Sequence, residues 1–313
     1  MLNTIAQEQD NDNNLKLIAA HRTIYSKAKK IFIFQIIFSG PIVIILTALS
    51  IYNINLVQTI NTYCFILSIL EIGLFSRWIT NLKTSAASIQ EKFDCDILHI
   101  PWNVILVPEQ STVSTVNKYS KKILEDKDDK AQIMGWYNYK NKDLEKTFPQ
   151  DIPYFAARIV AQKYNTNWDM ELRKSLLVIL NWLTGFMVFF IVCISFINKA
   201  SVPDLTQMFW PIFPITILLI KYYYDNNDST KKLDSLKRAL AEAWTQVLQS
   251  GSDSKKLLNT SRTIQDSIYL HRLNSPLIFD RFYRRKRNGQ QDDAADFVEQ
   301  LTKDYMLSHS INY

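Results

Sequence analysis

The chain has little glycine and little cysteine, and these shortages exclude several classes of protein. Six glycines in 313 residues leave little material for the Gly-rich loops that hold phosphate in dinucleotide-binding and P-loop enzymes. Cys64, Cys95 and Cys193 form no CxxC pair, which argues against a disulfide framework or a zinc site. HExxH and GxSxG are absent, and the four histidines are too scattered for a metal centre. We therefore predict no catalytic residues, no metal and no cofactor.

A cleavable signal peptide is also missing. The N-terminus MLNTIAQEQDNDNNLK has no cationic segment followed by a short apolar core, so we expect the first apolar run to stay in the protein. The formal net charge of +6 fits a cytosolic surface that meets anionic lipid or nucleotide. A basic excess is equally expected of any inner-membrane protein, so the charge alone decides nothing.

Four long apolar runs are what the sequence does contain. A helix needs about 20 apolar residues to cross a bilayer. The run from Ile31 to Tyr52 has 22 residues and no charge, and so does the run from Leu176 to Ile197. Val57 to Phe75 contains one ionisable residue, Glu71. Leu205 to Ile220 is shorter, and it is read as a fourth span or as a re-entrant or interfacial segment.

The spans pair into two hairpins whose short tips contain one basic residue, Lys199, whereas Lys and Arg gather on the other side. By the positive-inside rule both termini and the middle region are cytoplasmic and the protein is a multi-pass inner-membrane protein. We predict a mainly α fold with four transmembrane helices and a largely helical cytosolic region. The expected parts are an N-terminal helix (1–30), hairpin 1 (31–78), a cytosolic middle region (79–174), hairpin 2 (175–224) and a C-terminal helical region (225–313).

Local patterns predict the polar segments in more detail. Asn14 is expected to cap a helix that runs into the first span, with a kink at Gly40-Pro41. The stretch from Phe93 to Pro108 is expected to be loop or short strands, because its apolar runs are short and bounded by prolines. The pair Asn226-Asn227 with Ser229 is expected to start a helix that Gly251 ends. A further helix is predicted from Ser261 to Leu273, followed by a break at Pro276.

Polar residues within the spans are the first candidate functional residues. A carboxylate in a bilayer costs a few kcal/mol unless it faces water, protein or a proton. Asn61, Cys64, Ser68 and Glu71 recur at helical spacing and share one face, and Asn181 lies with Gly185 and Ser195 on a similar seam of the third span. These faces either line an aqueous path in an oligomer or hold helices together, with Glu71 near the interface.

Two charged clusters are the other candidates. The basic run Arg281, Tyr283, Arg284, Arg285 and Arg287 has the composition that binds phosphates and stacks on bases, although such a run also contacts anionic lipid or water. Asp94 and Asp96 resemble a metal-holding carboxylate pair of sugar-transferring enzymes, and they are more simply read as surface or turn carboxylates.

Over nearly its whole length the chain resembles the S-4TM family, four-transmembrane effectors found with second-messenger nucleotidyltransferases in bacterial CBASS antiphage systems. The resemblance is carried by LKLIAAHRTIYSKAKK at Leu15 to Lys30, IQEKFDCDILHIPWN at Ile89 to Asn103, ARIVAQKYNTNWDMELRK at Ala156 to Lys174 and TIQDSIYLHRLNSPLIFDRFYRRKR at Thr263 to Arg287.

The resemblance implies an effector that stays silent until a cyclic di- or trinucleotide from a partner nucleotidyltransferase triggers membrane permeabilisation and growth arrest or cell death. The partners it implies are this nucleotide, the lipid bilayer and further copies of the chain, but not DNA. Two hairpins cannot enclose a water-filled path, so a pore needs a homo-oligomer. The alternatives are a membrane-anchored enzyme using Asp94 and Asp96, and a scaffold whose spans only anchor the cytosolic part.

Overall fold

The computed structural model describes residues 3–50, 55–107, 112–134, 137–141, 144–198, 213–249 and 254–310, and within them the chain is mainly helical. A two-stranded antiparallel hairpin, β1 with β2, pairs Asn138 with Thr147. The elements are α1 (Ile5–Gln9), α2 (Asp12–Ser39), α3 (Pro41–Ser50), α4 (Asn55–Leu70), the π-helical η1 (Glu71–Phe75), α5 (Ser76–Leu98), α6 (Val113–Glu125), α7 (Lys127–Met134), β1 (Asn138–Asn141), β2 (Leu144–Thr147), α8 (Tyr154–Asn198), α10 (Phe213–Gln249), α11 (Ser254–Asn274) and α12 (Asp280–Ser310).

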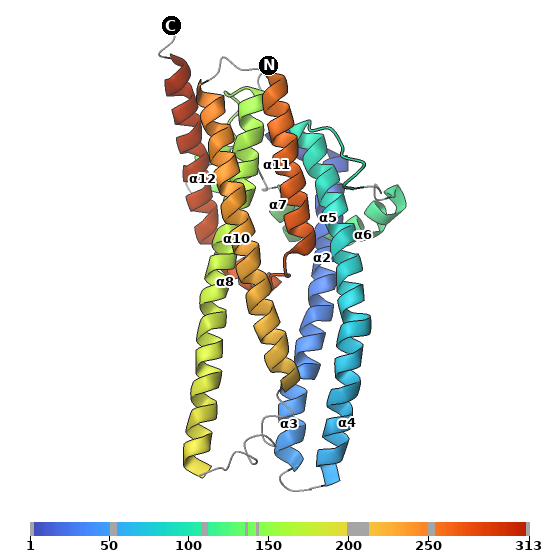
Figure 1. Cartoon of the computed structure of the whole chain (residues 1–313). Coiled ribbons are helices and arrows are strands. Elements are labelled where there is room, and N and C mark those ends of the chain that lie inside the picture. Colours follow the sequence, from blue (N-terminus) through green and yellow to red (C-terminus); the bar gives the residue numbers. More distant parts are fainter. Residues whose placement is uncertain are drawn as a thin grey trace.

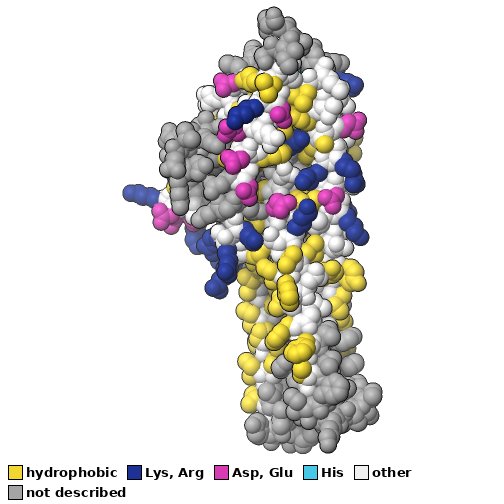
Figure 2. Space-filling view, turned by 90° about the vertical axis from the view of Figure 1, so that its left-hand side faces the viewer, with side chains coloured by type: hydrophobic (Ala, Val, Ile, Leu, Met, Phe, Trp, Pro, Cys, Tyr) yellow, Lys and Arg dark blue, Asp and Glu magenta, His cyan; other side chains and the backbone are white. Residues whose placement is uncertain are grey.

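The molecule is elongated and has two halves of different surface chemistry. The long helices run side by side along its length, with both termini at one end and α3 and α4 at the other (Figure 1). On the face shown in Figure 2, Lys, Arg, Asp and Glu side chains gather in the half that holds the termini, and hydrophobic side chains are prominent in the described part of the other half. We call these the charged half and the apolar half.

The apolar half is built from the predicted spans. Two described helices are long and apolar enough to cross a membrane, Asp12–Thr47 and Leu56–Leu98. The third run forms the C-terminal half of α8, where Trp182 and Phe186 are 78% and 66% exposed, as expected for side chains that meet lipid or another subunit. Of the fourth run, residues 205–212 lie outside the described residues, as do residues 53–54 and 199–204 of the hairpin tips.

The predicted kink in the first span is confirmed. Gly40 ends α2 and Pro41 begins α3, because proline cannot donate the next backbone hydrogen bond. A β-carbon on Gly40 would lie 3.2 Å from Cγ1 of Ile215, so glycine here permits the close approach of α10. In the second span, α4 passes through the π-helical turn η1, which begins at Glu71.

Three sequence predictions of helix boundaries were wrong. Helix α2 begins at Asp12, and Asn14 is instead buried and donates to the Glu8 carbonyl at 2.7 Å. Helix α5 continues to Leu98 through the segment expected to be loop or strand, and the loop starts only at His99. Helix α10 runs unbroken past Asn226. The predicted end at Gly251 lies outside the described residues, whereas α11 confirms the later helix and extends it at both ends.

The main core lies in the charged half, where α1, α2, α5, α8, α10, α11 and α12 meet. Phe93 and Ile97 of α5 are fully buried there, which explains why α5 stays helical beyond Glu91: its apolar positions keep the 3.6-residue spacing that faces the core. Leu233, Leu240 and Val247 of α10 confirm the apolar stripe of that helix.

Candidate functional site

A cavity of about 270 Å³ opens in the charged half, close to its border with the apolar half. The helices α2, α5, α7, α8, α10, α11 and α12 all contribute to its wall. The side chains that carry its chemistry are Arg22, Tyr25, Lys29, Lys83, Gln90, Tyr164, Asn165, Thr166, Trp168, Asp169, Arg173, His271, Arg272 and Tyr283.

Cationic side chains dominate this lining. Among the lining residues that the structure describes, five are Lys or Arg and Asp169 is the one Asp or Glu. Lys29 and Arg272 also contact carboxylates outside the cavity: Lys29 Nζ lies 2.5 Å from Asp280, and Arg272 Nη1 lies 2.5 Å from Asp94. The cavity therefore has a positive character that suits an anionic ligand.

Aromatic rings and an amide complete the wall. The ring of Trp168 lies 5.9 Å from Tyr164 and 6.2 Å from Tyr283, tilted against both. Asn165 donates from Nδ2 to the Tyr137 hydroxyl at 2.9 Å. Flat rings beside cations are the combination that binds a nucleotide, because bases stack on the rings while the phosphates meet the cations.

An ionic network on α8 fixes one side of the cavity. Arg173 is buried; its Nε donates to Asp169 at 3.1 Å and its Nη1 to Asn226 of α10 at 3.0 Å. His271 Nε2 lies 2.6 Å from Asp169. Burial alone would raise the pKa of Asp169, but Arg173 and His271 more than offset this and hold that pKa well below its usual range. Asp169 is therefore ionised at neutral pH.

The cavity floor connects to the apolar half. It is formed by the segment 275–278 between α11 and α12. Within this segment the Leu277 carbonyl accepts a hydrogen bond from the Tyr222 hydroxyl of α10 at 2.6 Å, and Leu277 belongs to a cluster with Phe32 of α2 and Leu180 of α8. A ligand that moved the floor would therefore move side chains on three of the long helices.

Lys83 of α5 is placed beyond the apolar run, which ends at Phe75. Burial and the nearby Arg173 lower the pKa of Lys83 to about 8, although Asp225 acts in the opposite direction. A bound phosphate would raise this pKa again, because it supplies the opposite charge.

The structure separates the members of the predicted basic run. Tyr283 lines the cavity, whereas Arg281, Arg284 and Arg285 are exposed on the first turns of α12 and do not line it. The side chain of Arg287 lies outside the described residues.

Glu71 lies between helices in this single chain. Its carboxylate accepts a hydrogen bond from the Ser39 hydroxyl of α2. Ser68 donates within α4 to the Cys64 carbonyl at 2.9 Å, and Asn61 is exposed. In the third span Asn181 and Gly185 are exposed, whereas the side chain of Ser195 lies outside the described residues. The contact between Glu71 and Ser39 is the arrangement expected of a residue that holds two helices together. The exposed side chains of Asn61 and Asn181 can face lipid or another copy.

Asp94 and Asp96 do not form a metal-binding pair. Asp94 is buried and accepts hydrogen bonds from Gln265 at 2.9 Å and from Arg272 at 2.5 Å, whereas Asp96 lies beside Lys92 at the surface. Carboxylates two residues apart on a helix point in different directions, so the interpretation as an ion site is wrong. The alternative of a surface or turn carboxylate is also wrong for Asp94.

Most of the cavity residues were missed by sequence reasoning. They come from seven helices and lie at positions where a lone Lys, Trp or Asn usually means a solvated or packed side chain. The available signal was weak: Asn165, Trp168, Asp169 and Arg173 share the polar segment YNTNWDMELR just before an apolar run.

Comparisons with known proteins agree with this architecture. Residues 3–301 match the family model described as the SMODS-associating 4TM effector domain. A protein of Bacillus cereus (strain VD146), described as a probable CBASS effector molecule, is 24% identical over 304 residues, which is 95% of this chain and 98% of the relative. No solved structure matches. Because the family model spans nearly the whole chain, the protein belongs to the family of SMODS-associating 4TM effector domains.

Proposed function

We propose that this protein is an antiphage effector that permeabilises the inner membrane when a cyclic oligonucleotide binds the cavity. The ligand is a cyclic di- or trinucleotide made by a partner nucleotidyltransferase. The Bacillus cereus relative, a probable CBASS effector molecule, supports a role in antiphage defence. The result of activation is loss of the membrane barrier, followed by growth arrest or death of the infected cell.

One observation carries this proposal: the basic, aromatic cavity lies at the border between the two halves, on helices that continue into the apolar half. Its wall uses α2, α8 and α10 as well as α5, which is continuous with α4 through η1. A ligand can shift an equilibrium only by binding one state better than another. Contacts on these helices give a ligand the means to favour a different arrangement of the spans.

The size of the cavity indicates that binding and movement are linked. Its volume of about 270 Å³ lies just below the roughly 300 to 1,000 Å³ of common ligand pockets. A cyclic dinucleotide is large for such a pocket, so the helices must move apart to enclose it. The described structure then corresponds to the silent state.

The proposed mechanism also requires four membrane spans in each chain and assembly of several chains. The spans are the four apolar runs, in two hairpins, with both termini in the cytoplasm. One chain cannot surround a water-filled path with two hairpins, so permeabilisation requires a homo-oligomer. The exposed apolar side chains of α8, such as Phe186 and Phe189, then face lipid or a neighbouring subunit.

Bacterial cells offer the test of this function. We expect cells that produce the protein alone to keep their membrane potential, and cells that also produce a cyclic-oligonucleotide-forming nucleotidyltransferase to lose it. A catalytically dead nucleotidyltransferase is the control. Equal depolarisation with the active and dead enzymes would mean that no nucleotide is involved.

Nucleotide binding should weaken at alkaline pH. Lys83, with a pKa of about 8, is largely protonated at pH 7 and largely neutral at pH 9. If only the protonated amine holds a phosphate, affinity falls about tenfold over this range. Calorimetric titrations at several pH values check this, and a Lys83→Arg variant, which stays charged, should bind with little pH dependence. The same slope in both proteins would assign the effect to another group.

Glu71 is predicted to influence which ions pass. The substitution Glu71→Gln keeps an acceptor for Ser39 but removes the charge, so we expect unchanged nucleotide binding and a several-fold lower preference for cations over anions during release. Thr62→Val, which removes a hydroxyl bonded within α4 outside the candidate face, is the control. Unchanged selectivity in ion-release assays would restrict Glu71 to holding α2 against η1.

A further inference from the structure

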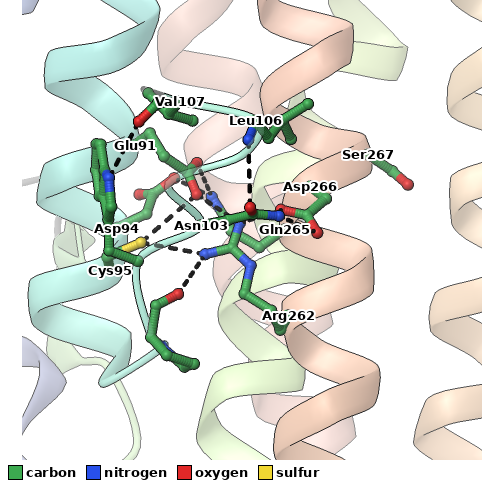
Figure 3. Close-up of polar contacts among 12 residues, drawn as sticks. Glu91, Asp94, Cys95, Asn103, Leu106, Val107, Arg262, Gln265, Asp266 and Ser267 are labelled. Atoms are coloured by element: carbon green, nitrogen blue, oxygen red, sulfur yellow. Dashed lines mark hydrogen bonds and ion pairs between the residues drawn. The ribbon is translucent and has the colours of Figure 1, made fainter. Parts of the chain in front are cut away.

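A buried ionic network holds α11 against α5 (Figure 3). Glu91 and Asp94 of α5 are 1% and 2% exposed. The amide of Gln265 on α11 donates to both carboxylates at 2.9 Å. Arg262 donates to Glu91 at 2.6 Å and also to the Pro101 carbonyl at 2.9 Å.

A guanidinium group balances the charge of each of these carboxylates. Arg262 lies 2.6 Å from Glu91 and 2.7 Å from Asp266 of its own helix, and Arg272 lies 2.5 Å from Asp94. The balance matters because removing one partner from a buried ion pair leaves a charge in a medium that solvates it poorly. Among the described residues within 4 Å, Arg272 is the one cation paired with Asp94.

Arg272 also lines the cavity. It therefore has two possible partners, the carboxylate behind it and whatever anion enters the cavity in front of it. Phosphate groups and carboxylates compete for the same N–H donors at the edge of a guanidinium, since both accept through paired oxygens.

We propose that Arg272 is the switch of this effector: an anionic ligand in the cavity takes the Arg272 guanidinium from Asp94 and so loosens α11 from α5. This inference rests on the proposed function, because it takes the cavity as the ligand site. Without Arg272, the neighbouring charges of Glu91 and Asp94 keep one guanidinium, that of Arg262, which pairs with Glu91 and also with Asp266. The contact between the two helices is then under-compensated, and the helices separate more easily.

Loosening of α11 from α5 would also affect the loop that follows α5. Arg262 holds the Pro101 carbonyl, and Asn103 donates to Asp266 of α11 at 3.1 Å. The same loop exposes Ile105, whose side chain is 92% exposed. A shift of α11 therefore repositions a loop with an apolar tip as well as the cavity wall.

Substitution of Asp94 tests the exchange. In Asp94→Asn, no carboxylate competes for Arg272, so we expect about tenfold tighter binding of whichever of cyclic di-AMP, cyclic di-GMP and cyclic tri-AMP the wild type binds. We also expect more release from liposomes without any nucleotide. Calorimetry on the full-length protein in nanodiscs measures the affinity.

Two variants separate the exchange from general damage to the network. Glu91→Gln removes an equally buried carboxylate that contacts Arg262 and Gln265 but not Arg272, and Asp96→Asn removes a surface carboxylate of the same helix. Both should bind within twofold of the wild type. Equal gains in Asp94→Asn and Glu91→Gln, or no gain in Asp94→Asn, would overturn the proposal.

The failure of the proposed function has a different signature. If the wild type binds none of the three nucleotides, the cavity is not a cyclic-oligonucleotide site. Inorganic pyrophosphate, which offers phosphate oxygens without bases, then tests the exchange alone. A tenfold gain for pyrophosphate in Asp94→Asn would support the switch, and equal binding by wild type and variant would refute it.

Discussion

The Arg173→Met variant should lose about 3 to 5 kcal/mol of unfolding free energy, the range for breaking a buried ion pair. Methionine fills a similar volume but leaves Asp169 without its main cation and Asn226 without its donor. The Pro276 carbonyl, which accepts from Arg173 at 3.3 Å, also loses a partner. We expect a much lower unfolding temperature in detergent, or failure to accumulate folded protein.

The neighbouring residue provides the control. Lys174 lies beside Glu171 with a separation of 3.8 Å, and its side chain is 50% exposed. Exposed pairs of this kind contribute at most about 1 kcal/mol, so Lys174→Met should unfold close to the wild-type temperature. Similar losses in both variants would mean that the buried pair of Arg173 and Asp169 contributes no more to stability than the exposed pair of Lys174 and Glu171.

The Lys83→Met variant should bind the activating nucleotide about 10- to 100-fold more weakly, because a hydrogen bond to a charged group contributes about 1.5 to 3 kcal/mol. Lys83 is half-buried in the cavity wall, where water competes poorly with a phosphate. The nucleotide concentration that causes half-maximal release from liposomes should rise by the same factor, while the unfolding temperature stays near that of the wild type.

Lys92→Met is the matched control on the same helix. Lys92 pairs with Asp96 outside the cavity, and its side chain is 38% exposed, so nucleotide affinity should not change. If both variants weakened binding equally, the nucleotide would be held by overall charge, and if neither did, the cavity would not be its site.

The apolar runs were predictable from sequence because lipid imposes a strong local requirement. A charge-free run of about 20 residues is typical of a helix that crosses a bilayer, and the break at Gly40 follows from the chemistry of proline. The family, too, was identified from sequence segments that lie in order around these runs. The features that predict a membrane span, its length and its lack of charge, are contained in the run itself.

The charged half was harder to predict because its decisive contacts are distant in sequence. The segment after Glu91 was predicted to be loop or short strands because its apolar runs are short and bounded by prolines. In the structure it continues α5, and its buried carboxylates Glu91 and Asp94 are satisfied by Arg262, Gln265 and Arg272, more than 170 residues away. No local pattern shows that these partners exist.

The helix start predicted at Asn226 was wrong for a related reason. Asparagine is favoured at helix starts, but Asn226 lies inside α10, where Arg173 donates to it. The arginines around Tyr283 resemble a phosphate site by composition, and among the described side chains of this run Tyr283 is the one that lines the cavity. Which turn of α12 faces inward depends on the packing of seven helices, and composition does not contain that information.

Ion release from liposomes carrying the purified protein is the most direct test of the proposal that a cyclic oligonucleotide triggers membrane permeabilisation. The protein is inserted, shown to be oriented and folded, and exposed to a panel of cyclic di- and trinucleotides, with Lys83→Met in parallel. We expect no release without nucleotide, release with at least one member of the panel, and a requirement for much more nucleotide in the variant. Absence of release with every nucleotide, from protein shown to be inserted, would contradict the account.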